Sequence, residues 1–224
     1  MAGFDEKPLR HGDMETIATV RDCAQNYFEG ASPSHDWYHV QRVEGLAETL
    51  LTERSDANEQ VLRLATLLHD IGRMREDQGQ IDDHAIWGAK EADTILSDVG
   101  LEQTKIEQVN HCIRVHRYSN DIEPKTVEAK LLCDADNLDA LEAVGIARCF
   151  SFGGEHGQAL YDPELPIESD KTVAGQTQLN HFHKKILSLP DRMYTEPGHR
   201  IAESRMSVVK EFIERFKLEA AGEV

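Results

Sequence analysis

An apolar run that ends in two metal-capable side chains constrains this chain more than any other feature of its sequence. Residues 61–68 are nearly all apolar, and His69 and Asp70 follow them directly. A helix that is apolar on every side is buried, and Gly72 supplies the backbone freedom that a helix end needs. The sequence therefore predicts a buried helix that ends with an imidazole and a carboxylate in the interior, where a charge must be paired or bound to a metal.

A neighbouring His-Asp pair is weak support for a metal site when it stands alone. Asp70 could cap a neighbouring helix, and His69 could be a core histidine with satisfied ring nitrogens. His39 and Asp136 change this interpretation, because each is flanked by apolar residues and is expected to point inward. Helical bundles build metal sites from side chains that converge from different helices. Nitrogen and oxygen ligands with open positions suit a catalytic divalent ion such as Mn, Fe, Co, Ni or Zn.

The acidic composition of the chain excludes several kinds of partner. The chain has 224 residues, enough for one fairly large domain, and its formal net charge is -17. This excess disfavours binding to DNA, RNA or an anionic membrane surface, because proteins that follow phosphates carry clustered Lys and Arg. A small phosphorylated substrate stays compatible, because a bound divalent cation can reverse the local potential.

The cysteines and the first residues indicate a compartment. The four cysteines are widely spaced without a C-x-x-C pair, which is typical of reduced thiols in a cytosolic protein. The first residues lack the basic and apolar regions of a signal peptide, and no apolar run approaches transmembrane length. We expect a cytoplasmic protein that does not associate with membranes. A homodimer is compatible with the long predicted helices, but the sequence carries no mark of one.

Helical periodicity extends through most of the chain, and no alternating strand pattern interrupts it. The predicted fold class is therefore all-α. Asp36 or Ser34 is expected to cap the helix that follows, Asp83 another helix, and Asp56 with Glu59 resembles a capping box for the buried helix. The predicted helices cover residues 14–28, 37–54, 59–70, 84–99, 102–116, 123–140, a short segment that ends at 150, 172–189 and 197–218.

One domain accounts for this pattern. We expect a flexible N-terminus at residues 1–12 and a single all-α domain at residues 13–224, with its core at about 35–150. Residues 73–83 are polar and are expected to be mobile. Residues 151–170 are rich in Gly and Pro and predict a lid-like loop, since long loops in compact domains often cover binding sites. C-terminal helices are expected at residues 172–220.

The order and the local contexts of these motifs resemble the HD-domain metal-dependent phosphohydrolases, a superfamily named for its adjacent His-Asp pair. The matching segments are HDWYH at residues 35–39, LLHDIG at 67–72 and DADNLDA at 134–140. The last segment, with GIAR at residues 145–148, is similar to a branch of stand-alone HD hydrolases. Some members of that branch release pyrophosphate from nucleoside triphosphates. The resemblance extends over residues 35–205 and implies a helical bundle with a metal site in its core.

The resemblance implies a set of metal ligands. His39, His69, Asp70 and Asp136 match the ligand positions of the superfamily. Asp134 is the alternative to Asp136, which is preferred because the ligand precedes a polar residue and a Leu in the family pattern. The implied cofactor is a divalent metal ion (Mn, Co, Ni, Fe, Mg or Zn), and we expect one ion rather than two.

Other residues match positions near the catalytic centre of the superfamily. His84 and His116 occupy places where some HD proteins recruit histidines for a second metal, although His84 could equally donate a hydrogen bond to a ligand or contact a phosphate. We therefore assign His84 and His116 to catalysis, together with Asp70. Each cationic candidate for binding substrate phosphates could instead form a surface salt bridge. These candidates are Arg73, Arg148, Lys184, Lys185 and Arg205, of which Arg148 is favoured because it shares the motif segment.

The resemblance implies metal-assisted hydrolysis of a phosphate ester or phosphoanhydride. The expected substrate is a nucleoside or deoxynucleoside triphosphate, with release of pyrophosphate. A nucleoside monophosphate phosphatase is the alternative enzyme. A regulatory metal-binding or nucleotide-binding module without catalysis is the alternative from another class, and the intact set of four ligands argues against it.

Overall fold

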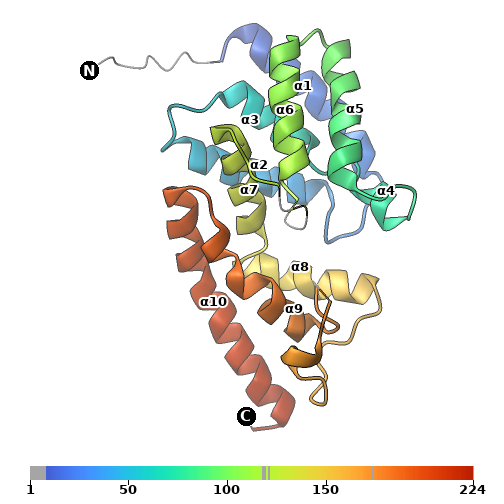
Figure 1. The fold of residues 1–224 in the computed structure, drawn as a ribbon, viewed down its shortest axis with the longest axis vertical. Coiled ribbons are helices and arrows are strands. Elements are labelled where there is room, and N and C mark those ends of the chain that lie inside the picture. The colour runs from blue at the N-terminus through green and yellow to red at the C-terminus, as the bar shows by residue number, and fades with distance from the viewer. Residues whose placement is uncertain (1–8, 118–119, 121, 173, 224) are drawn as a thin grey trace. The chain divides into compact units, whose positions relative to one another are not determined.

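The computed structural model describes residues 9–117, 120, 122–172 and 174–223, and it shows a helical protein (Figure 1). Within these residues the extended pairing is limited to an isolated bridge between Ala159 and Thr177, so the predicted all-α class is confirmed. The chain forms two compact units, residues 1–136 and 137–224. No helix in the described ranges combines the length and apolar character that crossing a membrane requires.

The first unit is built around helix α3, Glu59–Leu68, which packs against α1, α2 and α6. Val61, Leu64, Leu67 and Leu68 are each 0% exposed, which confirms the predicted buried helix. Helices α5 and α6 pack along each other. The other helices that begin in this unit are α1 His11–Gln25, η1 Asn26–Phe28, α2 Trp37–Leu51, α4 Arg73–Asp77, α5 His84–Asp98, α6 Gln103–Val115 and α7 Val127–Asp139, which continues into the second unit.

Side-chain caps fix where two of these helices begin. Asp36 accepts a hydrogen bond from the His39 backbone N–H, and Asp83 accepts one from the Ile86 N–H. Both caps were predicted from the sequence, and each places a histidine in the first turn of its helix. The predicted capping box of α3 is wrong, because Asn58 provides the cap.

Several predicted boundaries differ from the structure. Residues 11 and 12 belong to α1 instead of a flexible terminus, and residues 1–8 of that prediction lie outside the described residues. The polar stretch at 73–83 contains α4, whose ion pairs at i,i+3 and i,i+4 support a short helix. Helix α7 begins at Val127 instead of residue 123, because Thr126 caps it by accepting a hydrogen bond from the Ala129 N–H.

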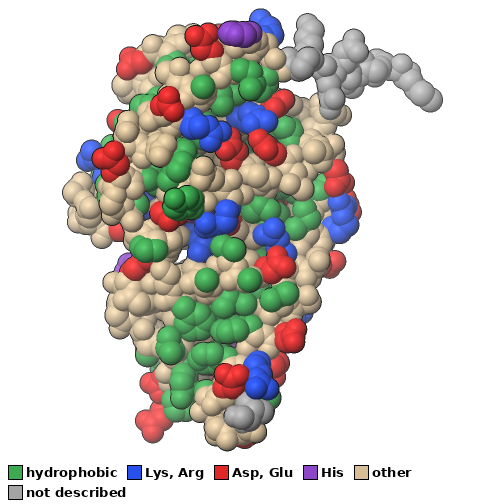
Figure 2. Space-filling model, turned by 180° about the vertical axis from the view of Figure 1, so that it is seen from behind, with side chains coloured by type: hydrophobic (Ala, Val, Ile, Leu, Met, Phe, Trp, Pro, Cys, Tyr) green, Lys and Arg blue, Asp and Glu red, His purple; other side chains and the backbone are tan. Residues whose placement is uncertain are grey.

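The second unit packs α8 against α9 and α10. Four phenylalanine rings pack together in this unit, with neighbouring centroids 5.7–5.9 Å apart: Phe150, Phe182, Phe212 and Phe216. Figure 2 shows acidic and basic side chains interspersed on one face of the molecule, with hydrophobic side chains gathered over this unit. Its elements are α8 Glu142–Glu155, η3 Ile167–Ser169, α9 Gln178–Lys184, η4 Ile186–Ser188, η5 Pro190–Arg192 and α10 Glu196–Ala221.

The structure revises two predicted segments of this unit. Helix α8 continues to Glu155, so the first residues of the predicted lid-like loop at 151–170 are helical. The long helix predicted at residues 172–189 is broken into α9 and η4. Thr177 causes the late start of α9, because its hydroxyl caps the helix by accepting a hydrogen bond from the Asn180 N–H.

Candidate metal centre

Six of the described side chains meet at the ends of the helices in the first unit. His39 comes from α2, and His69 and Asp70 follow the last turn of α3. Five of the six are nearly fully buried, and the side chain of Asp136 is 26% exposed. The remaining members are His84, the first residue of α5, and His116, the first residue after α6.

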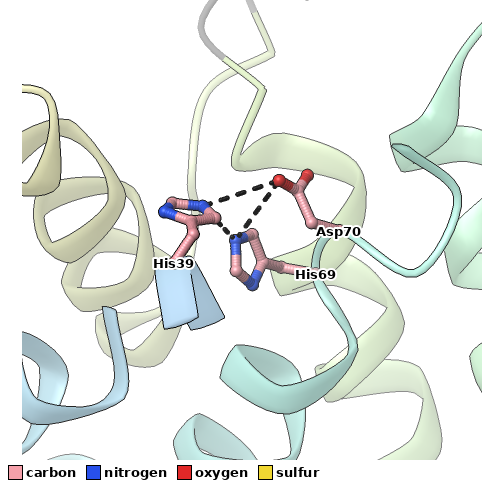
Figure 3. A group of neighbouring side chains, drawn as sticks. All are labelled: His39, His69 and Asp70. Atoms are coloured by element: carbon pink, nitrogen blue, oxygen red, sulfur yellow. Dashed lines mark hydrogen bonds and ion pairs between the residues drawn. The ribbon is translucent and has the colours of Figure 1, made fainter. Parts of the chain in front are cut away.

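His39, His69 and Asp70 form one compact group (Figure 3). The Nε2 atoms of His39 and His69 lie 3.2 Å apart. Oδ2 of Asp70 lies 3.5 Å from the His39 Nε2 and 3.8 Å from the His69 Nε2. Oδ1 of Asp136 lies 3.4 Å from the His39 Nε2. The structure therefore brings together the four side chains that the sequence identified as metal ligands.

The alternative carboxylate, Asp134, lies in a different environment. Its side chain is fully buried, and its negative charge adds to the hydrogen bond from Arg54 to Asp56 in raising the pKa of Arg54. Asp136 is two residues further along α7 and approaches His39 directly. The geometry therefore favours Asp136 over Asp134 as the carboxylate of this group.

His84 and His116 form a second group on the other oxygen of Asp70. Oδ1 of Asp70 lies 3.2 Å from the His84 Nε2 and 3.4 Å from the His116 Nε2. The two Nε2 atoms are 3.4 Å apart. Each of the two oxygens of the buried Asp70 carboxylate thus faces its own pair of imidazoles.

Hydrogen bonds at Nδ1 orient three of these imidazoles. The Nδ1 atom of His69 lies 2.7 Å from the carbonyl oxygen of Thr66, and that of His116 lies 2.6 Å from the carbonyl oxygen of Ile113. Nδ1 of His84 instead lies 2.6 Å from Oε2 of Glu76. An imidazole that donates its Nδ1–H in this way directs Nε2 toward the shared carboxylate.

Burial and mutual contacts shift the ionisation of this cluster. Burial lowers the pKa of His69 to about 4, so its imidazole is neutral at pH 7. Burial acts to raise the pKa of Asp70, but the surrounding imidazoles outweigh it and hold that pKa well below its usual value. Burial also acts to lower the pKa of His84, but hydrogen bonds to Asp70 and Glu76 raise it to about 9. A neutral His69 and an ionised Asp70 are the forms in which these side chains bind metals.

The donor set fits a divalent ion. Imidazole nitrogens and carboxylate oxygens suit first-row divalent metals. Two nitrogens bound at about 2.1 Å to one ion lie roughly 3.0–3.4 Å apart for octahedral or tetrahedral angles. The Nε2 atoms of His39 and His69 are 3.2 Å apart, and those of His84 and His116 are 3.4 Å apart. Within each pair, the two nitrogens are therefore spaced like two ligands of one ion.

Arg73, a predicted phosphate-binding residue, lies in the first unit at the start of α4. Its Nε lies 3.2 Å from Oδ1 of Asp77, and its NH1 lies 3.7 Å from Oε2 of Glu76. Among the described residues this buried Nε makes an ion pair with Asp77 but has no partner with hydrogen-bond geometry. Two acids of its own helix therefore accompany Arg73, and its role in phosphate binding stays a prediction.

Two further predicted phosphate-binding residues, Arg148 and Arg205, contact the segment that follows α7. NH1 of Arg148 lies 2.6 Å from Oδ2 of Asp139, and the two side chains are 14% and 3% exposed. NH1 of Arg205 donates a hydrogen bond to the carbonyl oxygen of Leu138, and its Nε lies 3.5 Å from Oε2 of Glu142. Both guanidinium groups thus have contacts within the second unit, and a role in substrate binding stays a prediction.

Lys184 and Lys185 lie at the C-terminal end of α9. Both are partly exposed. The charge of Lys185 contributes, after burial, to lowering the pKa of His181. Their role in binding substrate phosphates likewise stays a prediction.

Glu76 and Arg117 belong to the surroundings of the cluster, and no motif or spacing pointed to either residue. Oε1 of Glu76 lies 2.7 Å from NH1 of Arg117, which lies 3.0 Å from Oδ2 of Asp83. Glu76 is one of several acids in the polar stretch at 73–83, and no motif spacing relates it to His84. Their contact depends on the turn between α4 and α5, which spacing alone does not predict.

Comparisons with known proteins match the part of the chain that carries this cluster. The family model described as "HD domain" matches residues 36–141, a range that contains all six side chains of the cluster. The Bacillus subtilis protein YpgQ is 29% identical over 214 residues, which cover 94% of this chain and 96% of YpgQ.

Solved structures extend the similarity over both units. An HD-superfamily hydrolase from Bacillus thuringiensis is 32% identical with a TM-score of 0.72, covering 93% of this chain and 98% of that one. The crystal structure of YpgQ in complex with ADP is 28% identical with a TM-score of 0.72, covering 93% of this chain and 96% of that one. The likeness to these structures is therefore not limited to the residues that the family model matches.

Proposed function

The chain belongs to the HD superfamily, and from this we propose that it is a metal-dependent phosphohydrolase that acts on a nucleotide. The observation that carries the proposal is the position of Asp70, whose two oxygens face two pairs of imidazoles. A buried carboxylate with four imidazoles around it is far richer in metal ligands than a core hydrogen-bond network needs.

His39, His69, Asp70 and Asp136 would hold the metal ion. Nε2 of His39 lies 3.2–3.5 Å from a ligand atom of each of the other three side chains, and Nε2 of His69 lies 3.8 Å from Oδ2 of Asp70. A divalent ion in such a site supplies a water of lowered pKa and neutralises negative charge on phosphoryl oxygens. The partial exposure of Asp136 leaves this side of the cluster accessible to a small substrate.

His84 and His116 would act on the substrate from the other side of Asp70. Their Nε2 atoms are 3.4 Å apart, so both can contact one phosphoryl oxygen. An N–H group at either position donates a hydrogen bond to the negative charge that develops there, and burial strengthens this contact. The same nitrogens with Oδ1 of Asp70 could instead hold a second ion. Metal content distinguishes the two arrangements.

A nucleotide is the substrate class that the comparisons support best, because YpgQ was crystallised in complex with ADP. Within this class we propose a nucleoside or deoxynucleoside triphosphate as substrate and pyrophosphate as a product, following the resemblance of the DADNLDA and GIAR segments. Manganese is our first choice of ion. An acidic chain of net charge -17 favours a small anion neutralised by a metal over a nucleic acid polymer.

The test is hydrolysis by metal-stripped protein reconstituted with Mn, Co, Ni, Mg or Zn. Nucleoside and deoxynucleoside triphosphates and monophosphates are supplied, and pyrophosphate and orthophosphate are assayed separately. The His69→Ala variant, purified in the same way, controls for contaminating hydrolases. We expect pyrophosphate from triphosphates, whereas orthophosphate from monophosphates would identify a nucleotidase. Metal-bound protein without turnover on any substrate would contradict the proposal and favour a regulatory module.

A further inference from the structure

We propose that Glu76 is a positioning residue that holds the His84 imidazole in its working orientation. Glu76 lies on α4, and His84 is the first residue of α5. The inference rests on the proposed function, in which His84 acts on the substrate or on an ion. It adds a residue outside the predicted site and explains why the short helix α4 is next to the cluster.

Both ring nitrogens of His84 have a carboxylate partner. Nε2 lies 3.2 Å from Oδ1 of Asp70, and Nδ1 lies 2.6 Å from Oε2 of Glu76. The side chain of His84 is 3% exposed, so water does not compete for either nitrogen. The ring is therefore fixed by two opposed contacts, and only Asp70 belongs to the predicted metal site.

The place of His84 in its helix explains why a side chain is needed for this contact. His69 and His116 lie at helix C-terminal ends, and each uses the carbonyl oxygen three residues earlier, in the preceding helical turn. His84 is the first residue of α5, so no helical turn precedes it. An acceptor for its Nδ1–H must come from another element, and Glu76 provides it.

Arg117 in turn fixes Glu76. Its NH1 lies 2.7 Å from Oε1 of Glu76, while Oε2 lies 2.6 Å from Nδ1 of His84 and 3.7 Å from NH1 of Arg73. NH1 of Arg117 also lies 3.0 Å from Oδ2 of Asp83, the residue that caps α5 through its other oxygen. The helix that carries His84 and the carboxylate that orients it are thus joined through one guanidinium group.

The test compares Glu76→Gln and Glu76→Ala with Asp77→Asn. Asp77 lies on the same short helix and forms its ion pair with Arg73, outside the histidine cluster. The amide oxygen of Gln can still accept the His84 Nδ1–H, so Glu76→Gln keeps the geometry and removes the charge. Far-ultraviolet circular dichroism and the thermal midpoint show that each variant is folded.

The first readout is the His84 Nδ1 proton, observed by NMR in histidine-labelled protein and assigned by its absence in His84→Gln. A short hydrogen bond in a buried site protects such a proton from exchange. We expect a protected resonance in the wild type and in Asp77→Asn, a weakened one in Glu76→Gln and none in Glu76→Ala. A resonance that is equally protected in Glu76→Ala would overturn the inference.

The second readout is hydrolysis, measured as kcat and KM. Loss of a group that orients a metal-site histidine typically costs about 10–100-fold in activity or metal affinity. We expect a loss of this order in Glu76→Ala, partial recovery in Glu76→Gln and wild-type values in Asp77→Asn. Unchanged kcat and KM in Glu76→Ala would also overturn the inference. If the wild type itself lacked turnover, the proposed function would fail. The NMR signal of the His84 Nδ1 proton would still decide whether Glu76 orients His84.

Discussion

Nε2 of His39 lies 3.2 Å from Nε2 of His69, although 30 residues separate the two histidines. The same His39 nitrogen lies 3.5 Å from a carboxylate oxygen of Asp70 and 3.4 Å from one of Asp136. The Nδ1 of His69 is engaged with a backbone carbonyl, so its Nε2 is an acceptor when the ring is neutral. A single proton on His39 cannot satisfy three acceptors, whereas a divalent ion can bind all four groups.

Removing one of these ligands is expected to abolish turnover without unfolding the protein. We predict at least a 100-fold lower kcat/KM for His69→Ala and Asp136→Asn in the hydrolysis assay. Helical content should stay close to that of the wild type, because the apolar side chains of α3 remain buried. An exposed-site variant, His11→Ala, serves as the control. Full activity of either ligand variant would refute the assignment.

The cap of α2 is expected to support the metal centre. Oδ1 of Asp36 accepts a hydrogen bond of 3.1 Å from the His39 backbone N–H. Asp36→Ala should lower the free energy of unfolding by about 1 kcal/mol, because a helix N-terminal donor loses its partner. Asp36→Asn keeps the acceptor oxygen and should retain most of that stability. Urea denaturation measures both, and equal stability of the two variants would contradict the role of the cap.

Two glycines of α8 are expected to differ sharply in their tolerance of alanine. A Cβ atom on Gly145 would lie 2.1 Å from the carbonyl oxygen of Ala140, whereas a Cβ on Gly154 meets nothing within 4 Å. Gly145→Ala should therefore destabilise the protein by about 1–3 kcal/mol. Gly154→Ala should be neutral or stabilise it by up to about 1 kcal/mol, since alanine favours the helix. Thermal denaturation of the two variants makes the comparison, and similar midpoints would contradict the predicted cost of a side chain at Gly145.

His181 is expected to make stability depend on pH. Burial, with the charge of Lys185, lowers its pKa in the folded protein to about 4, from 6.5 for an unperturbed histidine. Between these values the unfolded state binds the proton more readily, so the free energy of unfolding falls as the pH falls from 6.5 to 4. The contribution is at most about 1.4 kcal/mol per pH unit.

The His181→Asn variant isolates this contribution, because Asn does not titrate in the window. Chemical denaturation at several pH values should show a steeper loss for the wild type than for His181→Asn. His11→Gln, at an exposed position, should follow the wild type. Equal slopes for the wild type and His181→Asn would mean that the buried imidazole is not the source of the pH dependence.

Much of the first unit could be predicted from local sequence signals. The apolar stretch at 61–68 identified the buried helix, and Asp36 and Asp83 identified two helix starts, because capping depends on neighbours in the chain. The order of His39, the His69-Asp70 pair and Asp136 identified the residues that meet in the cluster. Side chains near the ends of apolar helices converge when those helices share one core. The convergence of these four side chains therefore follows from the pattern.

The remaining features depend on tertiary contacts that the pattern does not encode. Glu76 resembles any acid of a polar stretch until the turn between α4 and α5 brings it to His84. Arg148 was favoured as a phosphate-binding residue, with a salt bridge as the alternative, and its partner could not be named, because the contact with the buried Asp139 depends on how α8 packs on the preceding segment. Helix α9 begins at Gln178, six residues later than periodicity suggested, because Thr177 caps it by accepting a hydrogen bond from the Asn180 N–H.

The most direct measurement of the central claim is anomalous diffraction from crystals of the full chain soaked with manganese. We expect a strong peak bounded by Nε2 of His39, Nε2 of His69 and Oδ2 of Asp70. A second peak beside Oδ1 of Asp70 would show that His84 and His116 hold an ion, and its absence would leave them free to contact substrate. Crystals that take up manganese elsewhere, or that show no peak at the His39, His69 and Asp70 group, would contradict the account.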